Sequence, residues 1–221
     1  MPAIRFVLLF SLSCWIGTLT AQPKKGYTIP PDTWLLRINP MGLIDPIETN
    51  LSLGTEYRFH ESWATSADVA YVFQSYNVRN AKHAKGFIVR PAIRKYFDRG
   101  LNTYVEAELH YKMVSSTVED WVGRKTVNGV AAYQEYKRFH ARKNVGGLHL
   151  KLGVQESLNR SHRLWLEVYA GIGVRHRWLT NDLPSDATYQ FMRSMFATNL
   201  NEERSTVPAF VGGFRLMYKI N

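Results

Sequence analysis

Histidine and glutamate side chains form the most reactive grouping in this sequence. The chain has seven histidines, and two of them, His110 and His149, lie in stretches where every second residue is polar. With Glu106 or Glu108 they could hold a metal ion or form an acid–base pair, because imidazole and carboxylate groups serve in both roles. No His-x-x-x-His spacing occurs. We therefore expect an interior hydrogen-bond network, with no catalytic group, no metal and no cofactor.

A larger set of ionisable residues alternates with apolar ones along the chain. Both signs of charge are present, so ion pairs can form between the members of the set. If these side chains are buried they must be paired, because an isolated buried charge costs several kcal/mol, as a rough figure. The predicted network consists of Glu56, Arg58, Asp68, Arg90, Arg94, Glu106, Glu108, Lys112, Lys151, Glu167, Arg175, Arg177 and Arg215.

Strands must position these residues, because the sequence alternates with period two. Leu148, Leu150 and Leu152, for example, are separated by His149 and Lys151. Pro91 lies within one run and removes a ladder hydrogen bond there. Such runs predict strands at residues 33–39, 50–59, 63–76, 87–97, 102–113, 145–155, 164–178 and 207–220.

The connections between these runs alternate between short and long. Tight turns are expected at residues 60–62, 98–100 and 159–162, and residues 39–49 join the first two strands. Long loops are expected at residues 77–85, 115–143 and 179–206, the last with a short amphipathic helix over 186–196. This pattern predicts an all-β fold, an eight-stranded antiparallel up-and-down barrel with both ends of the chain beside the short turns.

The first 21 residues resemble a secretory signal peptide, with a basic start, an apolar run and Ala21 before the expected cut. A membrane anchor and a lipoprotein are the alternatives, although Ser11 replaces the leucine that a lipid-modified Cys14 would need. No later run is long enough for a membrane helix. The expected organisation is a signal peptide (1–21), an N-terminal periplasmic segment (22–32) and one barrel (33–221).

Alternation alone does not say which face of the barrel is inside. Charges of both signs share the polar faces with small residues, which suit a crowded interior. Aromatic residues recur near the ends of the apolar faces, as in the girdles of membrane barrels. These features favour a transmembrane barrel over a soluble one with a salt-bridged surface. The small residues are Gly54, Ala92, Gly153, Gly171, Gly173 and Gly213, and the aromatic residues are Tyr57, Phe59, Trp63, Phe97, Trp178 and Tyr218.

Several segments together resemble a known family, the small outer-membrane β-barrels of the Bacteroidetes group, a domain of unknown function. These segments are residues 39–44 (NPMGLI), 56–58 (EYR), 90–97 (RPAIRKYF), 104–109 (YVEAEL) and 169–175 (YAGIGVR). The resemblance implies the fold and the outer-membrane location, and it makes a proline at position 91 ordinary. It implies no catalytic residue.

The sequence therefore predicts a barrel with a side-chain-filled lumen and a structural or surface-interaction role, not an enzyme. Its net charge of +10 and its basic 115–143 segment favour anionic partners. We expect outer-membrane lipid and lipopolysaccharide, the barrel assembly machinery through residues 213–218, a monomer, and no nucleic acid. One alternative is a soluble periplasmic lipocalin-like barrel. Another is a lipid A-modifying enzyme, with candidate residues Ser115, Ser116, Glu119 and His176.

Overall fold

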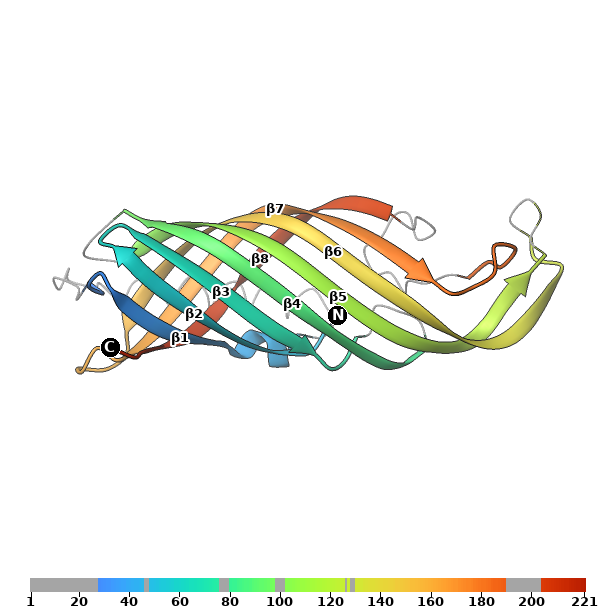
Figure 1. Ribbon diagram of the computed structural model, residues 1–221, viewed down its shortest axis with the longest axis horizontal. Helices are drawn as coiled ribbons and strands as arrows, with labels where there is room; N and C mark the ends of the chain where they lie inside the picture. Colours follow the sequence, from blue (N-terminus) through green and yellow to red (C-terminus); the bar gives the residue numbers. More distant parts are fainter. Residues whose placement is uncertain are drawn as a thin grey trace, which may run out of the picture.

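The computed structural model describes residues 28–45, 48–75, 80–97, 102–125, 127, 130–189 and 204–221. Within these residues the chain forms one sheet of eight antiparallel strands, in which each strand pairs with the next and β1 also pairs with β8 (Figure 1). The sheet therefore closes on itself as a barrel. The strands are β1 (Thr33–Asn39), β2 (Asn50–His60), β3 (Trp63–Val72), β4 (Ala81–Tyr96), β5 (Thr103–Arg124), β6 (Tyr133–Ser157), β7 (Leu164–Asn181) and β8 (Arg204–Lys219).

Some predicted features lie outside the described residues. They are the signal peptide, residues 22–27 of the N-terminal segment, the 98–100 turn and most of the 186–196 helix. A 3-10 turn, η2 (Pro40–Leu43), follows β1 directly. In the described part of the chain, no helix is both long and apolar enough to cross a membrane.

The period-two pattern places polar side chains inside and apolar side chains outside. On β7, Glu167 is fully buried while its neighbour Val168 is 48% exposed. On β6, His149 and Lys151 are buried, and Leu150 between them is 55% exposed. Successive side chains of a strand point to opposite faces of the sheet, so each strand presents one ionic and one apolar face.

The hairpin of β5 and β6 is longer than the sequence pattern predicts. The prediction of a long loop over residues 115–143 is wrong for most of that segment, because β5 runs to Arg124 and β6 begins at Tyr133. The two strands stay paired up to Arg124 and Tyr133, and Figure 1 shows them extending well beyond β1 to β3. The expected loops 77–85 and 179–206 are also shortened, by β4, β7 and β8. The pattern hid this extension because its apolar face switches sides there.

Pro91 lies within β4, as the period-two pattern predicts, and the strand continues past it. It is exposed and opposite Ala67 of β3. Pairing with β5 resumes in the same register on both sides, with Val89 opposite Tyr111 and Ala92 opposite Glu108. The proline therefore removes a donor without shifting the ladder.

Glycines allow large side chains to meet in the crowded interior. A Cβ atom built on Gly54 would lie 1.9 Å from Asp68 Oδ1 and 2.7 Å from the Ala67 carbonyl oxygen. One built on Gly153 would lie 2.3 Å from the Tyr104 hydroxyl. The interior has no room for added atoms at these two positions.

We predict that Gly54→Ala destabilises the barrel by about 1–3 kcal/mol, because the new methyl group displaces both the Asp68 carboxylate and a backbone carbonyl. The measurement is the free energy of unfolding of the detergent-solubilised protein in urea. Gly212→Ala is the matched control, because Gly212 is exposed and its nearest neighbour, the Tyr169 carbonyl oxygen, would be 3.5 Å away. Equal losses in the two variants would contradict this account of the interior.

Candidate functional site

The centre of the barrel contains a network of buried ion pairs built around Arg94. Its Nη1 atom lies 2.6 Å from Glu167 Oε2, and its Nη2 atom lies 3.0 Å from Glu167 Oε1, so the contact is bidentate. The same Nη1 atom lies 2.6 Å from Glu56 Oε2, and Nε contacts Glu106. Arg215 contacts Glu167 from the other side. All of these side chains are fully buried.

Further pairs extend the network around the barrel wall. Arg37 Nη2 lies 2.6 Å from Asp68 Oδ1, and Arg215 Nη2 lies 3.2 Å from Asp68 Oδ2. Lys151 Nζ lies 3.2 Å from Glu106 Oε1 and also contacts Glu108. Each carboxylate of the network faces at least one cation, as burial in a low-dielectric interior requires.

Tyrosine rings separate these charges and cover them. The Tyr96 hydroxyl donates to Glu56 Oε1 at 2.5 Å. The Arg94 guanidinium lies 4.3 Å from the centre of the Tyr104 ring, and that of Arg215 lies 4.3 Å from the centre of the Tyr169 ring. Such cation–π contacts are strongest where water is excluded.

Below the network, the N-terminal segment closes one end of the barrel. Ile29 is buried with Leu35, Trp165 and Met217. Arg58 Nη1 donates to the Ile29 carbonyl oxygen at 2.6 Å. The lumen is therefore filled at this end by an apolar layer beneath the ions.

At the other end, Glu48 of the β1–β2 connection forms ion pairs with the barrel wall. Lys143 Nζ lies 2.9 Å from Glu48 Oε1, and Lys112 contacts the second carboxylate oxygen. Burial alone would raise the pKa of Glu48, but the two lysines hold that pKa well below its ordinary value. The Glu48 carboxylate is therefore ionised at neutral pH.

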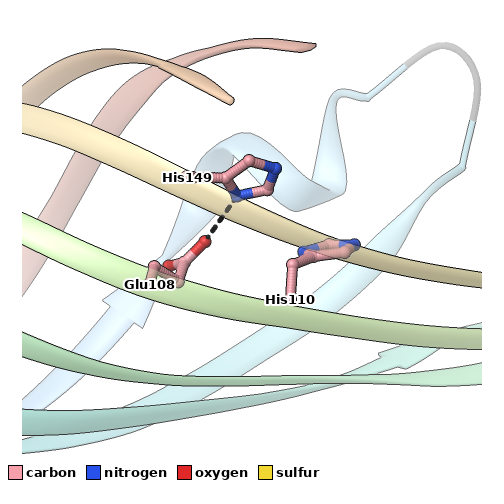
Figure 2. Close-up of side chains that lie close together, drawn as sticks. All are labelled: Glu108, His110 and His149. Atoms are coloured by element: carbon pink, nitrogen blue, oxygen red, sulfur yellow. Dashed lines mark hydrogen bonds and ion pairs between the residues drawn. The ribbon is translucent and has the colours of Figure 1, made fainter. Parts of the chain in front are cut away.

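Between the network and Glu48, three titratable residues gather on β5 and β6. Figure 2 shows Glu108 and His110 on β5 beside His149 on β6. His149 Nδ1 lies 3.0 Å from Glu108 Oε1, and the two imidazole rings lie 5.2 Å apart. Arg175 Nε donates to His149 Nε2 at 3.0 Å. Both nitrogens of His149 are therefore occupied, with the proton on Nδ1.

A cavity of about 370 Å³ adjoins this cluster. Arg90, Arg175 and His110 line it from the barrel wall, and Met41 of η2 and Phe210 of β8 line it as well. This volume lies within the range of roughly 300–1,000 Å³ that is usual for small-molecule sites.

The charges around the cavity favour an anion over a divalent cation. Glu108 is already paired with Lys151, and a metal bound by His149 would have to displace Arg175. Among the described residues Arg90 and Arg175 are in no ion pair, although Glu108 and Asp45 line the same cavity. His110 is 7% exposed, and its Nε2 atom has no hydrogen-bond partner. Guanidinium groups are donors that bind anions, and His110 Nε2 can donate as well in the tautomer that carries its proton there.

The structure places all of the predicted network residues on the inner face of the barrel, but it divides them into two groups. The central group forms the ion pairs described above, except for Arg58, which donates to the Ile29 carbonyl oxygen. Arg90, Lys112, Arg175 and Arg177 lie toward the outer end. Four partners were missed: Arg37, Glu48, Lys143 and Gln155. Arg37 alternates with Trp34, Leu36 and Ile38 and could have been found from that pattern, whereas nothing in the sequence points to Glu48.

The structure does not bring together the residues considered for a lipid-modifying enzyme. Ser116 is buried inside, whereas His176 is exposed and contacts Thr206 Oγ1 at 2.8 Å. Glu119 is paired with Arg138 on the outer surface. No shared site joins Ser115, Ser116, Glu119 and His176 in the described residues.

Comparisons with protein-family models, with curated proteins and with solved structures found no match to this chain. The resemblance to the small outer-membrane barrels of the Bacteroidetes group therefore stays a prediction.

We predict that Arg94→Leu destabilises the barrel by about 3–5 kcal/mol, because it leaves buried carboxylates without their cation. Arg138→Leu is the control. It removes an arginine that is paired with Glu119 but is 71% exposed, and such pairs contribute about 0–1 kcal/mol. The measurement is urea-induced unfolding of both variants. Comparable losses would show that burial of the network does not govern stability.

We predict that Glu48→Gln destabilises the outer end by about 3 kcal/mol at pH 7, because Lys112 and Lys143 then face each other without a counter-ion. Since folding lowers the pKa of Glu48, its contribution is present above the ordinary carboxyl pKa of about 4.3 and declines as the pH falls below that value. The difference in unfolding free energy between wild type and variant should thus shrink from pH 7 to pH 3. A difference that is constant with pH would refute the assignment.

Proposed function

We propose that this chain is a transmembrane β-barrel of a bacterial outer membrane, with a closed lumen and a structural or surface-interaction role. The observation that carries the proposal is a band of inverted polarity around the barrel. Within the band, apolar side chains face outward and ions face inward, and beyond it the pattern reverses.

The outward face of β7 is the clearest part of this band. It is apolar from Leu164 to Val174, and His176 then follows on the same face. These residues span about 11 positions, the length that a tilted strand needs to cross a bilayer. A soluble protein would pay a high cost to expose so much apolar surface to water.

The outward face of β5 changes from apolar to polar residues in a similar way. Outward on β5, Met113 is followed by Ser115, Thr117 and Glu119. Inward, Val118 and Val122 of β5 form a buried apolar core with Phe139 and Ala141 of β6, beside the buried polar residues Ser116 and Asp120. In the extension of β5 and β6 beyond Met113, the apolar core thus lies inside and polar side chains lie outside, as in a sheet that contacts water. This arrangement fits an extension above a membrane surface.

Aromatic residues lie at both edges of the band. Trp34 and Tyr57 stack at 4.6 Å near the end of the barrel that carries the short turns. Phe87 and Tyr111 lie 5.9 Å apart at the opposite edge. Amphipathic rings favour the two interfaces of a bilayer, so two girdles support the proposal.

Basic side chains lie just beyond the outer edge. Lys85, Arg142 and Arg204 are exposed there, close to the ends of the apolar faces of β4, β6 and β8. Lysine and arginine bind phosphate groups readily, which supports contact with lipopolysaccharide. A lipocalin-like role would need an apolar cavity, whereas the central lumen here contains ions.

We predict that Leu150→Arg destabilises the protein in phospholipid vesicles by about 2–4 kcal/mol, because it places a charge against acyl chains. The control, His140→Arg, changes an exposed outward residue of the same strand above the band and should have no measurable effect. Unfolding free energies in vesicles give the comparison.

The same preparations test the proposal as a whole. The wild-type protein should float with vesicles in a density gradient and should migrate differently in gels before and after boiling. A monomer that stays folded and soluble without detergent would refute a membrane-spanning barrel.

A further inference from the structure

The wall of the barrel has a gap between β1 and β8. Among the described residues these two strands pair at only four positions, Leu35–Ile38 against Leu216–Lys219. β1 ends at Asn39. Among the described residues, the part of β8 from Arg204 to Arg215 therefore pairs with β7 alone. In Figure 1, β8 extends well past the end of β1.

The 3-10 turn η2 only partly covers this gap. Met41 lies beside β8, since a Cβ atom built on Gly213 would be 3.6 Å from Met41 Cγ. Further up, Phe210 is 85% exposed and Ile44 is 70% exposed. The border of the gap is therefore apolar and accessible from outside.

The cavity beside His110 passes through this gap. Its lining includes Phe210 and Gly212, whose side-chain positions face outward, and also Arg90 and His149, which face inward. Phe210 lies opposite Ile172 of β7, within the apolar band. The cavity therefore connects the ionic interior with the level of the proposed membrane.

The inner part of the cavity is lined by Arg90, Arg175 and Lys151 together with the carboxylates Asp45 and Glu108, and neither arginine is in an ion pair that the described residues show. Arg90 donates one hydrogen bond, from Nη2 to Ser52 Oγ at 2.7 Å, and its Nε atom has no partner. Arg175 donates one hydrogen bond, from Nε to His149 Nε2, and Glu108, Glu48 and Asp45 act on it from a longer distance. Both arginines are partly buried, and phosphate suits guanidinium groups because it accepts paired hydrogen bonds.

We infer that this cavity binds the phosphate group of an anionic phospholipid, with the acyl chains leaving through the β1–β8 gap over Phe210. The inference rests on the proposed membrane location. Arg90, Arg175 and His110 hold the phosphate, and the apolar border formed by Ile44 and Phe210 holds the first part of the chains. Free phosphate could contact the same arginines, but it has no acyl chains to occupy the gap.

The test measures equilibrium binding of radiolabelled dioleoyl phosphatidic acid to the full chain in detergent micelles. Wild type should bind it, and Arg90→Gln with Arg175→Gln should weaken binding at least about tenfold, as expected for lost charged hydrogen bonds. The control is Arg160→Gln with Arg163→Gln, which removes the same charge from exposed positions in the turn between β6 and β7. Equal affinity in all three proteins would overturn the inference.

A second variant guards against misfolding of the double mutant. His110→Phe keeps a ring in place and breaks no described hydrogen bond, so it should fold and should still weaken binding about fivefold. Unchanged affinity in this variant would remove His110 from the site.

Two further ligands separate the sources of the phosphate. Dioleoyl phosphatidylcholine should bind much more weakly, and equal binding would overturn the role of the anionic headgroup. Binding of inorganic phosphate with the same affinity as the lipid would overturn the role of the gap. Flotation of the same wild-type preparation with vesicles tests the membrane location separately from lipid binding. If the protein did not float, the membrane location itself would be refuted.

Discussion

The bidentate contact between Arg94 and Glu167 is the interaction on which the rest of the barrel depends. It joins β4 to β7 across the lumen, and Glu56, Glu106 and Arg215 complete it. Every one of these ions loses its hydration on folding, and the attraction between the paired charges offsets the lost hydration free energy. The network is therefore intolerant of gaps, and small residues such as Gly54 are needed where large ionic side chains converge.

Where ionic side chains fill the centre of the lumen, the apolar side chains of the same strands face outward. The barrel thus acquires an apolar band whose width is set by where the ionic residues stop. Beyond Val114 the inner faces of β5 and β6 carry an apolar cluster of Val118, Val122, Phe139 and Ala141 beside the buried polar residues Ser116, Asp120 and Lys143. The outer face of β5 changes there from apolar residues to Ser115, Thr117 and Glu119. One physical requirement, the pairing of buried charge, accounts for both the closed lumen and the band.

Charge is balanced differently along the lumen. The central carboxylates are in close ion pairs, whereas Arg90 and Arg175 beside the β1–β8 gap are in no ion pair that the described residues show. Partly buried cations at this gap place an apolar border next to hydrogen-bond donors. The outer half of the barrel therefore differs from the centre, where the carboxylates are in close ion pairs.

Much of this structure follows from the sequence itself. Alternation with period two locates the strands and decides which side chains share a face, because that geometry is local to each strand. Only tertiary structure decides which ions meet. Arg94 and Glu167 are 73 residues apart, and closure of the sheet makes them neighbours. The length of the β5–β6 hairpin, the inward fold of Glu48 and the β1–β8 gap likewise depend on register and closure, which no local pattern records.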